Sequence, residues 1–421
     1  FPRRHACLQS SKIMNTLPKS VSHLSADSRL RVRHRGNTGL TVMVVLVVIA
    51  IVVVLIGLSL PAVRSSREAA RRMSCSINFR QNGRALHNYH SSYAQLPMQM
   101  GGTYRFDHPG GETGYRGTNG YRLSFLVGIT PFLEATDLWE RIASGEETDG
   151  DGSVFQPMGP APWSREFAPW QTEVPSLRCP SDPGIGLPMH GRVNFAACLG
   201  DATEAMETGA IRWNNQSKRW IQDRVAEVAV SGRGVFDPRQ SMRFRDIRDG
   251  ISNTIMGGEI VTDLGDNDNR SSPSFQNAWT SIHSSPTLCE DQRDAERPTF
   301  WSESDGPSDL GDDDHRRGAR WADGAAIYTS FFTILPPNRE ACVAGDDSGV
   351  GPLPVSSRHQ GGAHLLMSDG AVIFITDSID CGESGESTIQ LAGTDPTEDG
   401  PASPFGLWGA IGTRAASELI N

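Results

Sequence analysis

The 421-residue sequence has 39 lysine and arginine residues against 49 aspartate and glutamate residues, a net charge of −10. The charge is uneven, because residues 1–39 carry +7 and residues 64–84 carry +5, which leaves about −22 for the chain from residue 85 onward. Such an acidic body lacks the basic surface that displaces counterions from nucleic acid, so the composition argues against a nucleic-acid-binding protein.

The first predicted element is a membrane-spanning helix. Residues 1–38 form a basic leader for which we expect no fold, and residues 40–60 are an uncharged apolar run. At about 1.5 Å per residue, a helix of that length crosses the roughly 30 Å hydrocarbon core of a bilayer. A buried strand is disfavoured, since strands rarely exceed about 10 residues. We therefore predict a transmembrane segment over residues 39–63.

The start of this segment carries a candidate processing site. Gly39 separates the basic leader from the apolar run, and Leu40 follows it. This boundary resembles a prepilin-type cleavage and methylation segment, which implies that a prepilin peptidase cuts between Gly39 and Leu40. Pro61 then stands where type IV pilins commonly carry a helix-kinking proline. Val44 stands where shaft-forming pilins carry a glutamate, which implies a tip subunit or an anchor that does not polymerise.

Further segments extend the resemblance along the chain. They are LPAVRSSREAARRMSCSINFRQNGRALHNYHSSYAQLP with Cys75, PFLEATDLWERI, LRCPSDP, FRDIRDGISNTIMGGE, RWADGAAIYTSFFTILPPN, SRHQGGAHLLMSDGAV and GLWGAIGTRA. Together they resemble the prepilin-type H-X9-DG family, the planctomycete domain of unknown function 1559. The function of that family is not established, so the resemblance implies an architecture and no activity.

The predicted fold class is α+β, with a pilin-like long N-terminal helix packed on a β-rich body. The helix should continue past the membrane over residues 64–96, where apolar residues at steps of three and four mark one face. That face comprises Ala69, Met73, Ile77, Leu86, Tyr89 and Tyr93. Residues 97–421 then read as an exported domain of short strands separated by glycine and proline, with one further helix over residues 131–142.

The clearest strand signal is a C-terminal hairpin. Strands over residues 363–367 and 371–376 flank Asp369-Gly370, a dipeptide that tolerates positive φ at both turn positions. His359 lies ten residues before Asp369, and the two could form an acid/base or metal pair if they converged in a pocket. We adopt the structural interpretation, in which His359, Asp369 and Gly370 organise the hairpin, and we expect no catalytic residue and no enzyme.

Cysteine usage leaves two interpretations open. Cys7 lies in the leader, and the others follow the membrane segment, at Cys75, Cys179, Cys198, Cys289, Cys342 and Cys381. In an oxidising compartment they could pair as disulfides or remain buried thiols. The sequence has no CxxC and no local His-Cys cluster, so we expect no cofactor, and the sequence does not specify a metal.

Three weaker ligand signals each have a plain alternative. His87 and His90 have the spacing of a metal pair on a helix, but packing against a neighbour is preferred. The acidic stretches 149–151, 263–269 and 312–314 could bind calcium or simply be solvated. Four tryptophans could line a glycan or protein surface or belong to the core, namely Trp163, Trp170, Trp213 and Trp220.

Two functions remain. The leading hypothesis is a pilin-like or pseudopilin-like structural or interaction protein of the cell envelope, anchored in the inner membrane by a single span, with a cytoplasmic N-terminus and a periplasmic or surface-exposed body. Its expected partners are membrane lipid, the prepilin peptidase and other pilin-like subunits, and no nucleic acid. The alternative is a membrane-tethered domain that binds glycans or calcium.

Overall fold

The computed structural model describes residues 38–104, 118–145, 154–184, 190–277, 279–391 and 401–416. The chain divides into two compact units, Phe1–Ala62 and Val63–Asn421. Residues 1–37 of the predicted leader and the acidic stretch 149–151 lie outside the described residues.

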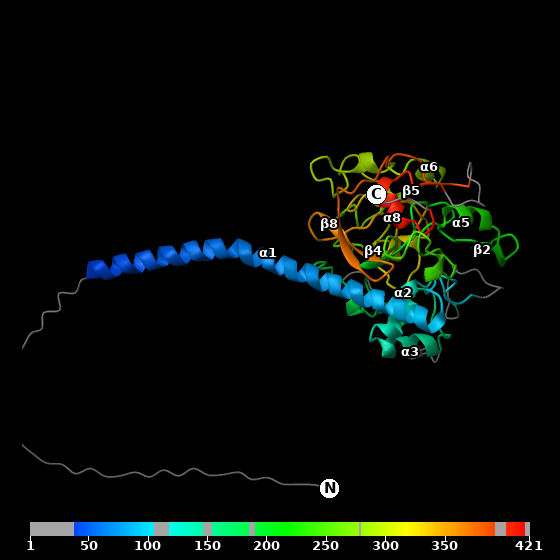
Figure 1. Cartoon of the computed structure of the whole chain (residues 1–421), viewed down its shortest axis with the longest axis horizontal. Coiled ribbons are helices and arrows are strands. Elements are labelled where there is room, and N and C mark those ends of the chain that lie inside the picture. Colours follow the sequence, from blue (N-terminus) through cyan, green and yellow to red (C-terminus); the bar gives the residue numbers. More distant parts are fainter. Residues whose placement is uncertain are drawn as a thin grey trace, which may run out of the picture. The chain divides into compact units, whose positions relative to one another are not determined.

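The α-helices of the described residues, several of which are labelled in Figure 1, are α1 (Thr38–Tyr93), α2 (Phe125–Ile129), α3 (Thr136–Ser144), α4 (Ala168–Gln171), α5 (Val225–Ser231), α6 (Trp279–Ser284), α7 (Ala326–Thr329) and α8 (Gly406–Gly412). The strands are β1 (Phe195–Cys198), β2 (Ile211–Asn214), β3 (Arg219–Gln222), β4 (Ile255–Glu259), β5 (Ser274–Gln276), β6 (Ser330–Phe331), β7 (Cys342–Ala344), β8 (Gly362–Met367) and β9 (Val372–Thr376).

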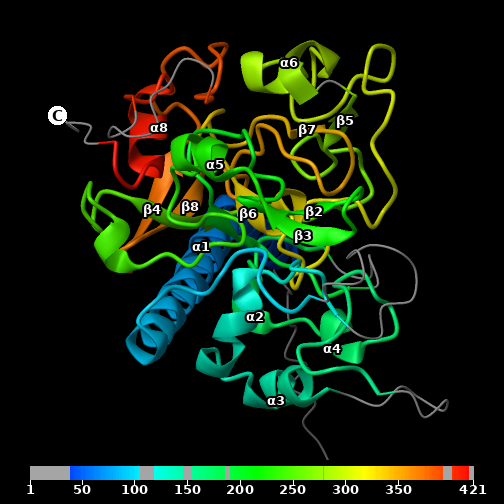
Figure 2. The same ribbon diagram turned by 90° about the vertical axis from the view of Figure 1, so that its right-hand side faces the viewer.

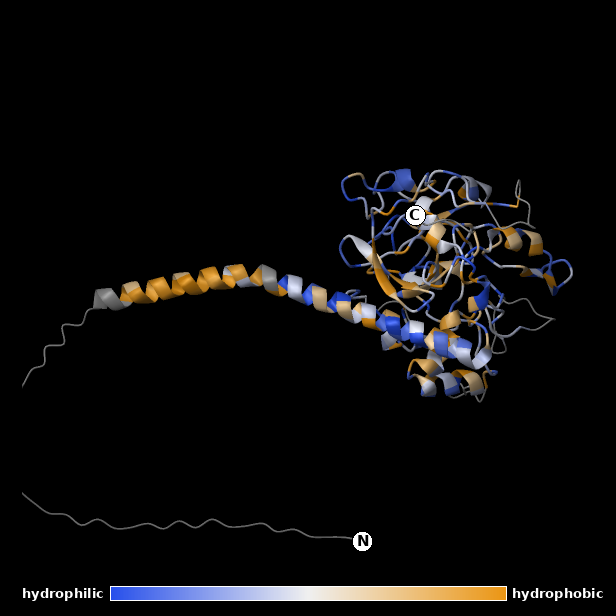
Figure 3. Ribbon diagram, in the orientation of Figure 1, coloured by the Kyte–Doolittle hydropathy of each residue, from blue (hydrophilic) through white to orange (hydrophobic). Residues whose placement is uncertain are grey.

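The first unit is represented by the start of α1, which is apolar on every side (Figure 3). Val52 is the least exposed of the large apolar side chains described between residues 42 and 60, and it is still 45% exposed. Pro61 lies within the helix. The structure confirms one helix here that is long and apolar enough to cross a membrane.

In the second unit α1 continues as far as Tyr93. It ends there because Ala94 adopts a left-handed conformation with φ of 56°, and the Ala94 N–H donates to the His90 carbonyl at 2.8 Å. A residue at positive φ is a common stop for a helix, although glycine usually fills that position. The helix predicted to residue 96 is therefore three residues shorter.

The predicted apolar face of this part of α1 is only partly correct. Leu86 is fully buried and Tyr89 packs against the core. Met73 and Ile77 are 59% and 52% exposed, so the prediction is wrong at these two positions, and Phe79 and Asn82 are buried. The Asn82 amide donates to the Ser176 carbonyl at 3.1 Å. A polar side chain can thus occupy the buried face because its donor is satisfied, which a hydrophobicity pattern does not reveal.

A five-stranded sheet forms the centre of the second unit, in the order β6-β1-β4-β8-β9. β1 and β6 pair in parallel, and the other neighbours pair antiparallel. Two smaller sheets, β2-β3 and β5-β7, have two strands each. The structure therefore confirms the α+β class, with the strands shorter than the loops that join many of them.

Helices lie on both faces of this sheet, as Figure 2 shows for α1 and α8 around β4 and β8. A Cβ atom on Gly83 of α1 would lie only 2.8 Å from the Leu366 side chain, so the missing side chain lets α1 lie directly on β8. Leu365, on the opposite face of β8, belongs to a buried cluster with Trp408 of α8. The alternation of side chains along a strand explains both contacts.

The helix predicted over residues 131–142 is only partly present. Thr130–Phe132 forms a 3₁₀ turn, and α3 begins at Thr136. Glu134 lies between them with φ of 59°. This left-handed residue interrupts a right-handed helix, so the prediction was correct for the second half of the segment only.

Candidate functional site

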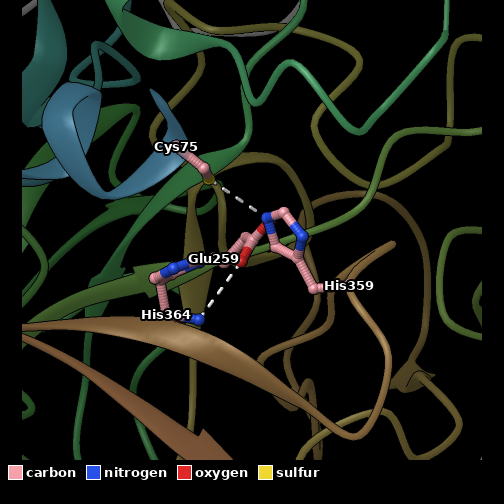
Figure 4. A group of neighbouring side chains, drawn as sticks. All are labelled: Cys75, Glu259, His359 and His364. Carbon is pink, nitrogen blue, oxygen red and sulfur yellow. Dashed lines mark hydrogen bonds and ion pairs between the residues drawn. The ribbon is translucent and has the colours of Figure 1, made fainter. Parts of the chain in front are cut away.

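Five polar side chains from four segments of the second unit meet on the α1 side of the sheet. They are Cys75 of α1, Cys179 after the turn Pro175–Leu177, Glu259 at the end of β4, His359 before β8, and His364 within β8. All five are buried. We call this set the Cys/His/Glu cluster, and Figure 4 shows its members other than Cys179.

Local structure aims these side chains at one another. His364 is two residues before Leu366 on β8, so it shares the face of the strand that α1 covers. The backbone N–H of His359 donates to the Ser357 hydroxyl at 3.0 Å. The backbone N–H of Cys179 donates to the Asn194 side chain at 2.9 Å. These bonds position two loop residues that no helix or strand holds.

The side-chain atoms of the cluster lie within a few ångströms of one another. The Cys75 thiol is 3.6 Å from Glu259 Oε1, and His359 Nε2 is 3.5 Å from the Cys179 sulfur and 3.8 Å from Glu259 Oε1. One ligand atom from each of Cys75, Glu259, His359 and His364 lies within 4.8 Å of all the others. Sulfur, nitrogen and oxygen donors therefore converge on a single point.

A second layer of hydrogen bonds orients the imidazole and the carboxylate. His359 Nδ1 lies 2.8 Å from Oε1 of Glu68, a residue of α1, and this contact turns His359 Nε2 toward the cluster. The backbone N–H and the Nδ1 of His364 lie 3.1 Å and 3.0 Å from Glu259 Oε2. Glu259 Oε1 is thereby left facing Cys75 and His359.

The cluster is electrostatically coupled. The hydrogen bond between the two thiols lowers the pKa of Cys179 and raises the pKa of Cys75. Burial opposes the charged form of His359, but the bond with Cys179 and the charge of Glu259 raise its pKa to about 9. Burial likewise opposes the charged form of Glu259, and the bond from His364 lowers its pKa. The neighbouring sulfur and carboxylate groups therefore favour the protonated form of His359.

The donor atoms determine what the cluster can do chemically. Thiolate, imidazole and carboxylate are the ligands of transition-metal sites in proteins, and two adjacent thiols can also form a disulfide. A nucleophilic role for either thiol requires that a substrate reach it. Cys75 and Cys179 are only 0% and 2% exposed, so the structure offers no such approach in this conformation.

Comparison with known proteins identifies the family. A family model described as a protein of unknown function (DUF1559) matches residues 64–382. The chain belongs to the DUF1559 family. The search of curated proteins and the search of solved structures found no match. The matched region begins at the first residue after Val63 and contains the whole Cys/His/Glu cluster.

Four segments that carried the family resemblance supply the cluster. Cys75 lies in the segment 60–97, Cys179 in 177–183, Glu259 ends 244–259, and His359 and His364 lie in 357–372. The sequence shows no local His-Cys cluster because these cysteines and histidines are far apart in the chain. The available signal was that each of these segments contributes a cysteine, histidine or glutamate, but only the fold brings them together.

In this DUF1559 protein the motif residues His359 and Asp369 do not converge. They lie at opposite ends of β8, which at about 3.3 Å per residue is roughly 20 Å long. The exposed Asp369 accepts a hydrogen bond from the Ala371 N–H at 2.9 Å. An acid/base or metal pair of these two residues is therefore excluded. The prediction that His359 helps to organise the hairpin is only weakly supported, since its ring lies 6.5 Å from that of Phe374 in β9. The polar contacts of its side chain are with Glu68 and the cluster.

The hairpin itself is formed by β8 and β9, paired from Gly362 with Thr376 to Leu366 with Val372. Its turn differs from the predicted one. The Gly370 N–H donates to the Met367 carbonyl at 2.9 Å, and only Gly370, with φ of 88°, has positive φ, whereas Asp369 does not. This is the type I turn followed by a left-handed glycine that is common in three-residue hairpin loops.

The two histidines of the helix pack rather than form a metal pair. The rings of His87 and His90 each lie 4.5 Å from the Phe244 ring. His87 Nε2 also lies 3.1 Å from the Ser368 carbonyl. His87 therefore fastens α1 to the hairpin turn.

Each described acidic stretch contains a carboxylate that is paired with arginine. Asp268 is bound by Arg270 at 2.6 Å and by Arg358 at 2.7 Å. Asp314 forms an ion pair with Arg165. Carboxylates that are neutralised by guanidinium groups are poor candidates for calcium ligands, so these contacts favour the non-calcium interpretation of both stretches.

The cysteines differ in their pairing, and the tryptophans differ in their burial. Cys289 and Cys342 form a disulfide, whereas Cys75, Cys179, Cys198 and Cys381 are free thiols. Trp170 is a core residue. Trp213 and Trp220 face each other across the β2-β3 hairpin, where both are half-buried, and Trp163 is also half-buried.

Proposed function

We propose that this DUF1559 protein is a pilin-like or pseudopilin-like structural or interaction protein of the cell envelope. The first part of α1 anchors it in the inner membrane, with the N-terminus in the cytoplasm. The family domain lies in the periplasm or at the surface. Gly39 and Leu40 form the processing site, and Pro61 stands in the helix that remains after cleavage.

One observation carries this proposal. α1 is a single helix from Thr38 to Tyr93 that begins in apolar sequence and continues into the family domain. The apolar side chains described between residues 42 and 60 have no core of their own chain around them, so lipid is the environment that would satisfy them. A secretory signal sequence, by contrast, has a shorter apolar region and is removed from the mature protein.

The body supports a display or interaction role more than catalysis. Its most chemically distinctive group, the Cys/His/Glu cluster, is buried, and buried ion pairs connect its loops. Arg233 and Asp201, for example, are 2.6 Å apart and almost fully buried. Such pairs hold irregular segments in one conformation, because breaking a buried pair leaves an uncompensated charge in the interior.

The mature N-terminus tests the proposal. The full chain would be expressed in cells with and without a prepilin peptidase, and the membrane-bound protein would be measured by intact mass and N-terminal sequencing. We expect cleavage between Gly39 and Leu40 only when the peptidase is present. Retention of residues 1–39, or a start near Arg64, would contradict the proposal.

A second glycine in the apolar run provides a control. It tests whether the peptidase recognises Gly39 itself or only the hydrophobicity of the segment. Gly39→Val should abolish cleavage, because the peptidase reads the boundary glycine. Gly57→Val, in the middle of the same apolar run and with no atom within 4 Å of the added Cβ, should be processed normally. Equal processing of both variants would show that the boundary glycine is not read.

Val44 defines the assembly that we propose. A new N-terminal ammonium in an apolar helix bundle needs a carboxylate partner, and an unpaired charge there costs several kcal/mol. The chain should therefore occupy a tip or remain unpolymerised. Electron microscopy of cells that express it with an assembly ATPase should show no fibres made of this chain alone, and Val44→Glu should increase its incorporation into the fibres of glutamate-bearing relatives.

A glycan-binding function is the second candidate, and the aromatic group around β2-β3 favours it over calcium binding. Trp220 lies 5.9 Å from Trp213 and 5.3 Å from Tyr121 between ring centroids, and Arg239 stacks on the Trp220 ring. Partly exposed aromatic faces suit sugar rings. A glycan-array signal that Trp213→Ala removes, in protein that the peptidase does not process, would favour this candidate.

A further inference from the structure

We propose that the Cys/His/Glu cluster is a binding site for a divalent transition-metal ion of the zinc class. The ligands are Cys75, Glu259, His359 and His364, and Cys179 stands beside them as an additional sulfur donor. This inference is independent of the membrane anchor, because every residue involved belongs to the second unit.

The spacing of the donors matches a metal ion. Bonds from zinc to sulfur and nitrogen are about 2.0–2.3 Å, so neighbouring ligand atoms in a tetrahedral site lie roughly 3.3–3.8 Å apart. The contacts of Cys75 with Glu259 at 3.6 Å, His359 with Cys179 at 3.5 Å and His359 with Glu259 at 3.8 Å fall in that range. The widest separation among the four ligands is within 4.8 Å, which requires only small side-chain movements.

The second layer has the form that metal sites use. A histidine that binds metal through one ring nitrogen usually donates the other N–H to a carboxylate, which orients the ring and increases its basicity. His359 has this arrangement, because its Nδ1 contacts Glu68 at 2.8 Å while Nε2 faces the thiols. Glu68 is partly exposed, with 41% of its side-chain surface accessible, so it plays no part in the core.

A metal ion would also explain why so many potential ligands are gathered at one buried point. Two thiols, two imidazoles and a carboxylate are removed from water at one point, and buried ionisable groups are costly unless they are paired or bind a metal. A groove of about 570 Å³, lined by Glu68, Arg72, His364 and Phe374 among others, lies beside the cluster.

The consequence of the site is mechanical. The ligands come from α1, β4 and the β8 region, so one ion would fasten the helix to the sheet and link segments that are far apart in sequence. Binding energy at such a site adds directly to folding stability, because the unfolded chain has no preformed site. The metal thus secures the displayed domain to the helix that carries it.

The test uses the full chain in detergent, stripped with a chelator and then dialysed against Zn²⁺ or Co²⁺. We expect one equivalent of bound metal, a rise in melting temperature, and thiolate-to-cobalt charge-transfer absorption in the near ultraviolet, which only a coordinated thiolate produces. Cys75→Ser combined with Cys179→Ser should remove this absorption, and His359→Gln should reduce it by weakening metal binding. Cys198→Ser and His190→Gln, which change a buried thiol and a buried histidine outside the cluster, should retain it.

Glu68→Gln keeps the test decisive if a core variant does not fold. It should leave the fold intact and weaken metal binding by about 10- to 100-fold, the usual effect of losing a carboxylate that orients a ligand histidine. Absence of bound metal in the unmodified chain, equal binding by the cluster and control variants, or an intact mass that shows a Cys75–Cys179 disulfide would each overturn the proposal. None of these outcomes bears on cleavage at Gly39.

Discussion

The two parts of α1 form the same secondary structure for different reasons. Up to Leu60 the helix is uniformly apolar, and its large side chains are exposed in the chain itself. From Val63 to Tyr93 the sequence is rich in polar residues, yet Cys75, Phe79 and Asn82 are buried. The apolar part can be identified from composition, whereas the face of the polar part depends on which neighbours its side chains meet.

This difference shows where hydrophobic periodicity loses its value. A uniformly apolar helix has no distinct buried face, so a sequence pattern cannot assign the wrong face to it. In the polar part, the hydrophobic pattern places Met73 and Ile77 on the buried face, but both are exposed. Asn82 is buried instead, and its amide donates a hydrogen bond to the Ser176 carbonyl. Burial of a polar group is decided by its partner and not by its hydropathy.

The largest effect should come from charges in the apolar part. Ile51→Asp combined with Leu55→Asp places two carboxylates one turn apart in the proposed membrane span, and each raises the free energy of insertion by about 2.5–3.5 kcal/mol. We expect the protein to move from the membrane pellet to the soluble fraction after alkaline carbonate extraction. The matched pair Met73→Asp and Ile77→Asp, on exposed positions of the polar part, should stay in the pellet. Retention of the first pair would show that this segment does not span.

The rotation of the polar part can be tested by truncating one side chain on each face. Phe79 is buried and packs edge-to-face on Phe195 with ring centroids 5.0 Å apart. Phe79→Ala should lower the free energy of unfolding by about 3–5 kcal/mol. Ile77→Ala, on the exposed face, should change it by no more than about 0.5 kcal/mol. Denaturant titration of the detergent-solubilised chain measures both, and the reverse order would restore the face predicted from the sequence.

The smallest effect concerns the hairpin turn on which the polar part of α1 rests. Gly370 has φ of 88°, and an added Cβ would meet only the His87 ring at 3.7 Å. Gly370→Ala should therefore cost about 1–2 kcal/mol through backbone strain alone. Gly385→Ala, where φ is not in the left-handed region and only Thr287 is near, is the control. Equal melting temperatures for the two variants would argue against a strained turn.

The strands around Asp369-Gly370 were predictable because alternation and a turn dipeptide are local signals. The geometry of the turn was not, since Asp369 keeps negative φ and the loop takes one more residue. The cluster was missed altogether. Cys75 and Glu259 are 184 residues apart. No local spacing rule can detect a cluster whose side chains come from a helix, a strand and loops that are distant in the sequence.

By itself, the sequence determined the apolar span, the acidic body, the α+β class and the family, because each depends on composition or on motifs read within one segment. The tertiary structure alone decided that Met73 and Ile77 of α1 are exposed. It also decided that His359 points to Glu68, Cys179 and Glu259 rather than toward Asp369. It also decided which cysteines pair. These outcomes depend on contacts between residues that are distant in the chain, and the energy of such a contact exists only once the fold has brought both partners together.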